Sequence, residues 1–417
     1  MRTVGAAAAA PFLAQLASAQ RLFGAQVEDL ELSQLAGDAF QDLRAAYMLA
    51  PDVVYLNHAS IGTIPRAVHD ARVRYLALCE TNPWLYMWGG EWEEPREVVR
   101  GRAARLLRCE DDEIAITHNT TEMFNVLAAG LPFGRGDEVL FSSFNHDGAS
   151  IPFDHHATER GYRVTRFSFP IADIPRMSAD DVLQIYDDHI TPNTRLLVFP
   201  HVDNIVGLRH PGQALAQLAR SRGVEFIAVD AAQTVGMVPV DARAMGVDVI
   251  ATSPHKWLQA PKGLGLAYVS AAAQASLRPM WVTWGQGRWE GTARVYEDYG
   301  TRNLAEVLAL GDAIDFQSRI DPSERERRLR SLWEFTRSRV ERTDGTGWAS
   351  PATWDLAASL IGVTVPGDSS QLSRRLFADH GIVFRPFNVE GRHSVRLSPN
   401  VFTTEEEIDR FFRLVTA

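Results

Sequence analysis

Lysine is nearly absent from this sequence. Of its 42 lysine and arginine residues, two are lysines, Lys256 and Lys262, and both lie in the stretch ATSPHKWLQAPKGLG. Arginine supplies a positive charge but stays protonated, whereas a buried lysine can lose its proton and bond covalently to a carbonyl compound. Because this chain uses arginine at its other basic positions, the two lysines that it keeps are candidates for a chemical role that arginine cannot fill. Two chance survivors on a surface loop are the alternative.

Cysteine and basic charge are also in short supply. Cys79 and Cys109 show neither a CxxC motif nor zinc-type spacing, so a disulfide framework or metal cluster is disfavoured, and a single disulfide stays open. The pair His155-His156 lacks a third spaced ligand, and we expect no metal. A formal net charge of −10 disfavours nucleic acid as the main partner. After the N-terminal segment, no run is long and apolar enough to span a membrane.

What is present is an ordinary globular composition, with 46% hydrophobic and 23% charged residues over 417 positions. That length suits one large domain or two of moderate size. Residues 1–19 differ, because Arg2 precedes an alanine-rich apolar run that ends in Ala17-Ser18-Ala19. This layout is typical of a secretory signal peptide and resembles the end of a twin-arginine signal without its arginine pair. It favours export to the periplasm and predicts that residues 1–19 are dispensable. An alanine-rich helix on a cytoplasmic protein is the alternative.

Short apolar runs alternate with helical patterns through the middle of the chain. The runs lie at 113–117, 138–142, 195–199, 225–229, 248–252 and 265–269, and helical spacing appears at 120–131 and 212–222. Continuous apolar strands separated by helices predict an α/β fold with a largely parallel sheet covered on both faces.

The pattern loosens after about residue 275. Residues 304–343 are rich in arginine and glutamate and helical in spacing, and a strand at 394–397 precedes a helix at 404–414. Residues 28–50 also look helical and amphipathic. We therefore predict a large domain over 50–295 and a smaller α+β domain built from 20–49 and 296–417.

Chemistry-bearing residues follow three of the predicted strands. Asp230 ends one strand, and Ser253 to Lys256 follow the next. Ligands of open α/β sheets bind beyond the carboxyl ends of the strands. Thr120 and Thr121 stand at a predicted helix N-terminus, which suits a phosphate group. A lysine amine, a carboxylate and an anion cradle are the three groups that pyridoxal phosphate requires.

The runs VDAAQTVG, VIATSPHKW and PKGLG resemble the core of the class V aminotransferases, a family that includes cysteine desulfurases and isopenicillin N epimerase. The segments YLNHASIG, HNTTEMFN, HVDNIVG, YGTRN and VRLSPNVFTTEEEID extend the resemblance over nearly the whole chain after residue 50. The resemblance implies a pyridoxal-phosphate-dependent transferase of fold type I. Such a fold has a mostly parallel, seven-stranded type of sheet with helices on both faces, and a smaller α+β C-terminal domain. It also implies a homodimer with shared active sites.

The same resemblance implies a role for each matching residue. Lys256 would form the Schiff base with the cofactor and shuttle protons, and Asp230 would pair with the pyridinium nitrogen. Gln233 and Asn204 would lie near the phenolic oxygen, and His146 would stack on the ring. The phosphate would be held by Thr120, Thr121, Ser253, His255 and, across the dimer interface, Thr301. The substrate would meet Asn57, Arg385 and Arg396, with Arg396 as the carboxylate clamp.

Some of these residues have plainer interpretations. Asp230 could be a helix cap, His146 a surface residue, and Arg385 or Arg396 a solvated charge. We assign no chemistry to Lys262, which would shape the turn before the next strand or contact the rim of the active site.

The reaction is expected to occur at the α-carbon of an amino acid or an amino-acid-derived substrate. Cysteine desulfurases need a mobile cysteine near the C-terminal part of the site, and both cysteines here lie before residue 110. That leaves an epimerase, an aminotransferase or a carbon–sulfur lyase, and the LNH and GTRN segments look most similar to the isopenicillin N epimerase branch. A cofactor-binding regulator without catalysis is disfavoured by the acidic charge and by the presence of Lys256 and Asp230.

Overall fold

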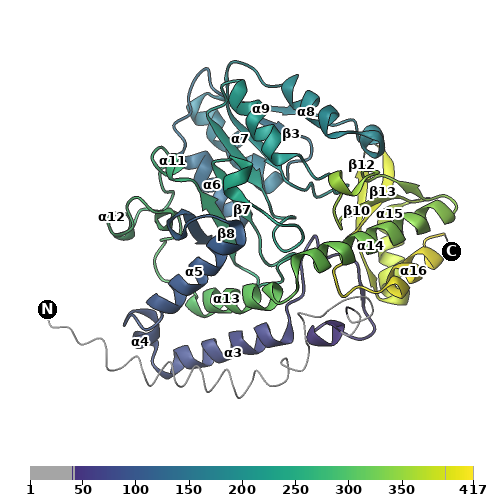
Figure 1. Ribbon diagram of the computed structural model, residues 1–417, viewed down its shortest axis with the longest axis horizontal. Coiled ribbons are helices and arrows are strands. Elements are labelled where there is room, and N and C mark those ends of the chain that lie inside the picture. The colour runs from purple at the N-terminus through teal and green to yellow at the C-terminus, as the bar shows by residue number, and fades with distance from the viewer. Residues whose placement is uncertain (1–39, 41–42, 390, 417) are drawn as a thin grey trace.

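A computed structural model describes residues 40, 43–389 and 391–416. Figure 1 shows a large sheet-and-helix unit that continues, toward the C-terminus, into a smaller unit built on a second sheet. The predicted signal segment, 1–19, and most of the helix predicted at 28–50 lie outside the described residues. Within that helix prediction, Leu43–Ala46 form a 3-10 turn, η2.

The large unit is built on a seven-stranded sheet among the described residues. Its strand order is β2-β8-β7-β6-β5-β3-β4, and β8 alone runs antiparallel to its neighbours. The strands are β2 (Ile114–Thr117), β3 (Glu138–Ser142), β4 (Arg163–Phe167), β5 (Thr194–Pro200), β6 (Phe226–Asp230), β7 (Val249–Thr252) and β8 (Gly265–Val269). The prediction of a mostly parallel sheet is confirmed.

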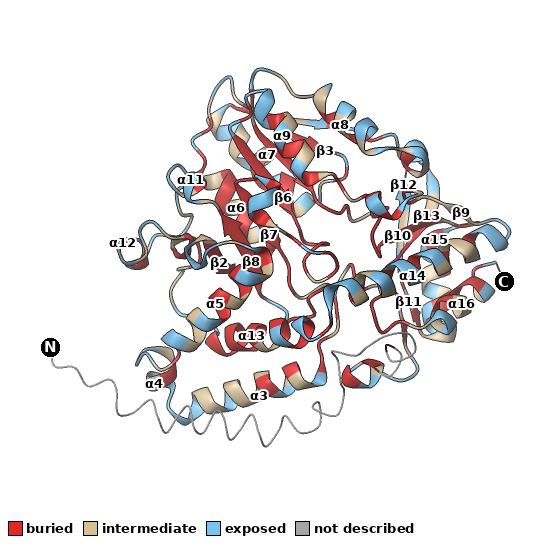
Figure 2. Cartoon of the chain, viewed as in Figure 1, coloured by how far each residue is buried: buried red, intermediate tan, exposed pale blue. Residues whose placement is uncertain are grey.

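Alternating residues of the central strands pack into two different layers. Val139 and Phe141 of β3 join one core with α6 and α7, whereas Leu140 joins the other core with α5, α9 and α13. Both faces are therefore dry, which explains the unbroken apolar runs (Figure 2). The helices of this unit are α3 (Arg66–Thr81), α4 (Pro83–Met87), α5 (Glu93–Leu107), α6 (Thr120–Gly130), α7 (Asp147–Arg160), α8 (Ala179–Asp187), α9 (Gly212–Ser221), α10 (Ala242–Met245), α11 (Ala271–Gln274), α12 (Gly285–Arg288) and α13 (Leu304–Ser318).

Strand β4 is the one that the apolar runs missed. Its sequence is RVTRF, and it is the edge strand of the sheet, with Arg163 exposed to solvent. Arg163 and Thr165 donate to the buried Glu138 carboxylate of β3, each over 2.8 Å. An edge strand carries charge because it must not pair with other chains, and this charge hides it from a search for apolar runs.

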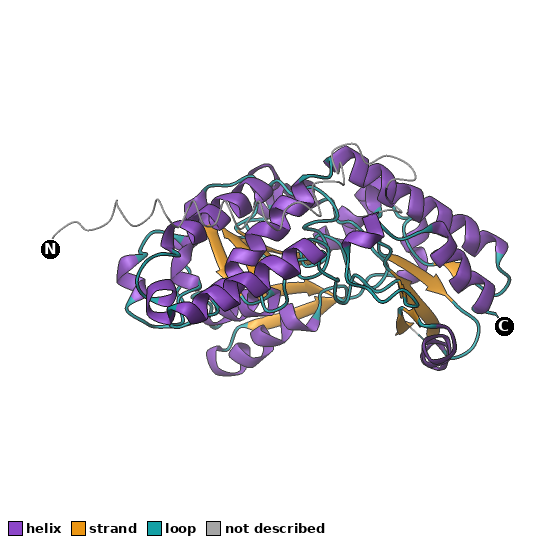
Figure 3. Cartoon of the chain, turned by 90° about the horizontal axis from the view of Figure 1, so that it is seen from below, coloured by secondary structure: helices purple, strands orange, loops and turns teal. Residues whose placement is uncertain are grey.

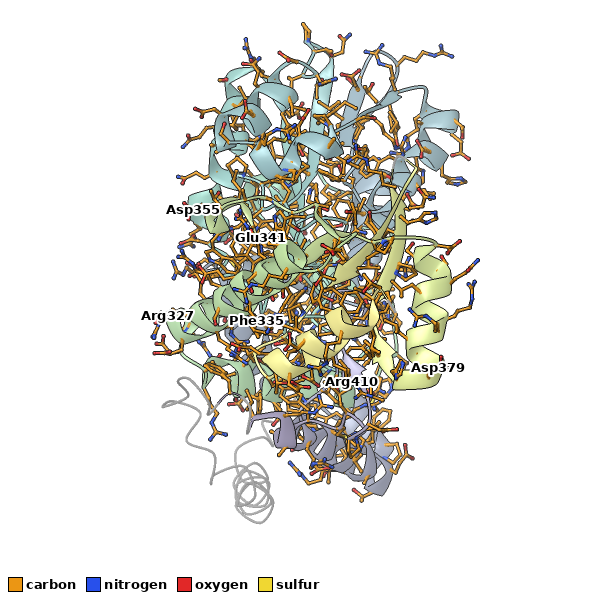
Figure 4. The ribbon with its side chains drawn as sticks, turned by 90° about the vertical axis from the view of Figure 1, so that its right-hand side faces the viewer. Arg327, Phe335, Glu341, Asp355, Asp379 and Arg410 are labelled. Carbon is orange, nitrogen blue, oxygen red and sulfur yellow. The ribbon has the colours of Figure 1, made fainter. Side chains whose placement is uncertain are left out.

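The smaller unit has an antiparallel sheet with the order β12-β13-β10-β9. Its strands are β9 (Gly347–Trp348), β10 (Ile361–Thr364), β12 (Arg385–Val389) and β13 (Arg392–Leu397), and its helices are α14 (Pro322–Arg342), α15 (Ser369–His380) and α16 (Glu405–Leu414). Figure 3 shows the two groups of strands separately, and Figure 4 labels Arg327 and Phe335 on α14 and Arg410 on α16, two helices that pack against each other. The helical stretch predicted at 304–343 divides into α13 and α14, because Asp321 caps a new helix that starts at Pro322.

The start of the described chain returns to the smaller unit. Strand β1 (Val54–Tyr55) pairs in parallel with β11 (Ile382–Val383), and Asn57 forms a bridge with Ser398. This pairing brings the YLNHASIG segment beside β13. The domain limits at residues 49, 295 and 296 stay a prediction. Among the helices described here, none is long and apolar enough to cross a membrane.

Candidate active site

Three segments meet beyond the carboxyl ends of β6, β7 and β2. Asp230 ends β6, Lys256 follows β7, and Thr120 opens the helix after β2. They border one cavity. Its lining includes eight of the residues singled out in the sequence: Thr120, Thr121, His146, Asn204, Asp230, Gln233, Ser253 and Lys256. The arrangement that the strand ends predicted is therefore present as a single concave site.

Lys256 lies on a tight turn inside this site. Its backbone N–H donates to the Ser253 carbonyl over 3.1 Å. Burial lowers the pKa of its ammonium group from 10.5 to about 8; the Asp230 carboxylate opposes this shift and the Arg396 cation adds to it. The amine is therefore far closer to its neutral, nucleophilic form at physiological pH than an exposed lysine would be.

The Lys256 turn is held against the YLNHASIG segment. The Gly62 N–H donates to the His255 carbonyl over 2.9 Å. A β-carbon on Gly62 would lie 2.1 Å from the Lys256 carbonyl oxygen, which is closer than non-bonded atoms can approach. Glycine at 62 thus allows two chain segments to touch backbone to backbone, and this contact fixes where the lysine stands.

Asp230 and Gln233 are buried residues that line the cavity. One Asp230 carboxylate oxygen accepts from the Ala232 N–H over 2.9 Å, and the residue is buried. The Gln233 amide donates to the Ala59 carbonyl and accepts from the Trp257 indole N–H, both over 2.9 Å. Gln233 therefore joins the YLNHASIG segment, through Ala59, to the Lys256 turn, through Trp257. The sequence did not predict this role.

Hydroxyl groups gather at the N-terminus of α6. The Ser253 hydroxyl accepts from the Thr120 N–H over 3.1 Å and lies 2.8 Å from the Thr120 hydroxyl. Thr121 is exposed toward the cavity, and a β-carbon on Gly148 would lie 2.4 Å from its hydroxyl oxygen. Hydroxyls at a helix N-terminus, with a glycine that keeps the space open, fit the phosphate of a cofactor.

His146 lies at the N-cap of α7, where its Nδ1 accepts from the Gly148 N–H over 3.0 Å. It is exposed and borders the cavity, which leaves a ring-stacking role open to it. His255 is outside that lining. Its Nδ1 is buried without a partner among the described residues, and burial lowers its pKa to about 4. A buried nitrogen without a partner marks a place where a bound group could supply one.

Arg396 lies beside the cavity and is almost fully buried. It donates to the Asn204 carbonyl over 2.8 Å, to the Asn57 side chain over 3.1 Å and to the Ser60 hydroxyl over 2.5 Å. These partners are neutral, so its charge is not cancelled by a contacting carboxylate. Its pKa is lowered to about 9, first by burial and then by the Arg385 charge. Such a cation is a ready partner for an anion.

Two predicted residues lie apart from this cluster. Arg385 is exposed and pairs in register with Arg396 on the neighbouring strand. Thr301 is exposed and borders a separate cavity with Trp88 and Trp284. Within one chain, Thr301 therefore does not join the Lys256 cavity.

Sequence reasoning missed several residues that shape the site. Ser60 contacts Arg396, Gly62 touches the Lys256 turn, and Gly148 adjoins Thr121. Ser60 and Gly62 belong to the segment YLNHASIG, but nothing local to this segment indicates that it lies against Arg396 and Lys256.

Neither cysteine borders the Lys256 cavity. Cys79 lies on α3 and Cys109 follows α5. Burial raises both thiol pKa values, that of Cys109 to about 12, so neither is an activated thiolate. No group of three or more potential metal ligands is found among the residues that the structure describes.

Comparison with known proteins places these features in context. The model of the family described as Aminotransferase class-V matches residues 54–411. The isopenicillin N epimerase of Amycolatopsis lactamdurans is 30% identical over 393 residues, which cover 90% of this chain and 98% of that relative. The isopenicillin N epimerase of Streptomyces clavuligerus is 28% identical, over 89% and 96%. A solved structure of the cysteine desulfurase from Thermococcus onnurineus NA1 superposes with a TM-score of 0.78 at 22% identity, over 90% of this chain and 98% of that one.

Proposed function

Because this chain belongs to the class V aminotransferase family, a family of pyridoxal-phosphate enzymes, we propose that it uses pyridoxal phosphate to act at the α-carbon of an amino-acid substrate, and that the reaction is an epimerisation. The carrying observation is the buried Lys256 amine, with its lowered pKa, in one cavity with the Asp230 carboxylate and the Thr120–Ser253 hydroxyl pair. When bound, the cofactor supplies an electron sink that makes the α-proton of an amino acid acidic.

We infer the holding residues from the contacts around the cavity. Lys256 would bind the aldehyde covalently, and Asp230 would pair with the pyridinium nitrogen. Thr120, Thr121 and Ser253, at the N-terminus of α6, would hold the phosphate, and His255, with its unpartnered Nδ1, would assist. His146, Asn204 and Gln233 would complete the surroundings of the ring.

The chain's own residues then perform binding and proton transfer. Arg396, held by Asn57, Ser60 and the Asn204 carbonyl, would bind the substrate carboxylate and so orient the α-carbon. The Lys256 Nζ has a pKa near 8, close enough to neutral pH for its neutral form to accept the α-proton and for its ammonium form to return it. An epimerase must return the proton to the opposite face of the α-carbon, whereas an aminotransferase delivers it to an atom other than the α-carbon.

Epimerisation is favoured over the other reactions by two observations. The chain resembles two isopenicillin N epimerases over 98% and 96% of their length. Neither cysteine, Cys79 or Cys109, has a lowered pKa or borders the cavity, which disfavours a persulfide-forming desulfurase. An aminotransferase and a carbon–sulfur lyase remain the alternatives.

We also propose that the active sites are shared between two copies of the chain. Thr301 lines one cavity with Trp88 and Trp284, two exposed tryptophans whose ring centroids lie 6.1 Å apart. Clustered exposed apolar side chains mark interaction surfaces. A second copy that covers this surface would carry Thr301 toward its neighbour's site.

Deuterium exchange tests the proposed reaction. The purified enzyme, loaded with cofactor, is incubated in D₂O with single L-amino acids and with larger α-amino acid derivatives. Proton NMR and chiral chromatography are then recorded. The proposal predicts loss of the α-proton signal together with appearance of the opposite stereoisomer. Stoichiometric keto acid would show an aminotransferase, and release of sulfide or thiol would show a lyase.

A further inference from the structure

The loop that follows β5 closes on itself. The Asp203 N–H donates to the Leu208 carbonyl over 3.1 Å, which closes a ring of residues 203–208. We call this ring the Asp203 loop. Its residue Asn204 borders the Lys256 cavity. The shape of the loop therefore bears directly on the candidate active site.

The Asp203 carboxylate holds this loop from the inside. It is fully buried, and it accepts from the N–H groups of Ile205 over 2.7 Å, of Val206 over 2.8 Å and of Leu208. Among the residues that the structure describes, no cation contacts it. Backbone N–H groups that bond to a carboxylate favour its charged form. A buried anion thus fixes the backbone of the loop.

One peptide group of the loop links this anion to Arg396. The N–H of Ile205 and the carbonyl of Asn204 belong to the same peptide bond. The N–H donates to the Asp203 carboxylate over 2.7 Å, and the carbonyl accepts from the Arg396 guanidinium over 2.8 Å. Because a trans peptide group is planar, with its N–H and C=O directed to opposite sides, the bond to Asp203 sets the direction of the carbonyl that Arg396 meets.

This arrangement places a counter-charge near Arg396 without occupying its donors. Arg396 makes three described hydrogen bonds, all to neutral groups, and a guanidinium has more N–H donors than these bonds use. Its Nε is buried without a partner among the described residues. If Asp203 contacted Arg396 directly, it would take the donors that a substrate carboxylate needs. Acting through a peptide group, it leaves them available.

The far side of the Asp203 loop is fixed to the strand beside Arg396. The Ser350 hydroxyl donates to the Val206 carbonyl over 2.6 Å and accepts from the Gly362 N–H over 2.8 Å. Gly362 pairs with Arg396 in the register of β10 and β13. The loop and Arg396 are therefore held to the same strand, and the direction of the 204–205 peptide group is what remains for Asp203 to set.

We propose that Asp203 is a positioning residue for Arg396: its carboxylate orients the 204–205 peptide group, whose carbonyl holds the guanidinium with its remaining N–H groups free for a substrate carboxylate. This inference rests on the proposed function, because it takes Arg396 as the carboxylate clamp. It adds that the clamp depends on a buried anion that touches neither the guanidinium nor the substrate.

Two amines that differ in one group test this role. L-Alanine has a carboxylate where L-alaninamide has a neutral amide, and the affinity of the cofactor-loaded enzyme for each is measured from the change in cofactor absorbance. The wild type is expected to bind alanine about 10-fold or more tightly than alaninamide, the range for a hydrogen bond to a charged group. Asp203→Asn presents an N–H₂ group where a carboxylate oxygen accepted a backbone N–H. It should remove most of this preference and leave the alaninamide affinity unchanged.

Asp248→Asn is the matched control. The Asp248 carboxylate is also buried and accepts from a backbone N–H, that of Ile227, over 2.7 Å, but it precedes β7, whereas Lys256 follows the other end of this strand. A merely structural loss should appear equally in this variant, which should keep the alanine preference. Arg396→Ala, in contrast, should abolish the preference.

The wild-type enzyme gives a second measurement that requires no variant. Burial raises the pKa of Asp203 to about 6, against the opposing effects of its backbone N–H bonds and Arg396. Its charge is therefore present above pH 6 and lost as the pH falls through 6, so the alanine preference should fall between pH 7 and pH 5. The other groups near the loop keep their charge state over this range: the pKa is about 9 for Arg396, about 3 for His201 and His210, and raised for Tyr186. Both probe amines stay protonated, so their own titration cancels in the ratio of affinities.

Two results would overturn the positioning role: an Asp203→Asn enzyme that keeps the wild-type preference, or a wild-type preference that is the same at pH 5 and pH 7. If Asp203→Asn does not fold, the pH series decides. A wild type without any preference would remove the Arg396 clamp, and this inference with it. An Asp203-dependent preference in an enzyme that exchanges no α-proton would support the positioning role and refute the proposed reaction alone.

Discussion

The α-carbon of Gly62 faces the carbonyl group of Lys256 so closely that a methyl group built on it would lie 2.1 Å from the carbonyl oxygen. The two residues are far apart in the sequence, and their contact joins the YLNHASIG segment to the turn after β7. The Gly62 N–H also donates to the His255 carbonyl over 2.9 Å. The position of Lys256 in the cavity thus depends on a glycine that takes no part in the chemistry.

We expect Gly62→Ala to displace this turn. Relief of the overlap requires backbone movement, and overpacking of this kind costs about 1–3 kcal/mol of folding free energy. Chemical denaturation should show that loss, and cofactor affinity should fall with it. Gly134→Ala is the matched control, because a β-carbon at Gly134 meets no atom within 4 Å. A Gly62→Ala enzyme as stable and as tightly cofactor-bound as the Gly134→Ala enzyme would contradict the importance of this contact.

The lowered pKa of Lys256 predicts how cofactor capture depends on pH. The attacking amine must be neutral, and its pKa is about 8 in place of 10.5. Below pH 8 the folded protein holds mostly the ammonium form, so the capture rate should rise about tenfold per pH unit. Above pH 8 it should level off. The capture rate is measured by stopped-flow absorbance when cofactor-free enzyme is mixed with pyridoxal phosphate at each pH. A free lysine derivative, treated in the same way, is the control for the effect of pH on the cofactor itself. A rate that still climbs to pH 10 would refute the lowered pKa.

Arg396→Ala should lower kcat/KM for every accepted substrate. Loss of one partner of a buried charged pair costs roughly 2–5 kcal/mol, which is about 30-fold to several thousand-fold. Cofactor absorbance should survive, because the Lys256 cavity is lined by other residues. Because Arg396 also holds Asn57 and Ser60, Arg396→Lys should keep the fold and recover part of the activity. If Arg396→Ala kept near wild-type kcat/KM with all substrates, the carboxylate clamp would lie elsewhere, and Arg385 would be the next candidate.

Shared active sites predict rescue by mixing subunits. Lys256→Ala lacks the amine, and Thr301→Asp would place a negative charge against the partner's phosphate site. Each variant should be inactive alone. A mixed dimer would contain one site with an intact Lys256 and an intact Thr301, so activity should return to as much as half that of the wild type. Lack of rescue in mixtures that analytical ultracentrifugation shows to be dimeric would contradict the shared site.

The sequence predicted the parts of this molecule that follow from local chemistry. Apolar runs located β2, β3, β5, β6, β7 and β8, because these strands are buried on both faces. The edge strand β4 escaped, because RVTRF is charged where the sheet meets water. Likewise, Asp230 and Lys256 could be placed at one edge, since parallel strands end together.

Contacts across the chain could not be predicted in the same way. The Arg396 bonds to Asn57 and Ser60 span more than 330 residues and depend on the pairing of β1 with β11. The approach of Gly62 to Lys256 is a backbone contact, and a lone glycine in a sequence gives no indication of its neighbour. Thr301 raises a different difficulty, because its predicted role needs a second chain.

The scarcity of lysine in this chain provides the most direct test of the role of Lys256. The cofactor-loaded enzyme is reduced with borohydride, which fixes the pyridoxyl group on the lysine that bears it, and is then digested and mapped by mass spectrometry. Lys256 is buried in the cavity, whereas Lys262, the one other lysine, lies outside its lining. We predict that the added mass appears on Lys256, and that Lys256→Arg neither gains the mass nor shows the visible absorbance of bound cofactor. A label on Lys262 in the wild-type enzyme, or an unlabelled Lys256, would contradict the assignment on which the proposed function is built.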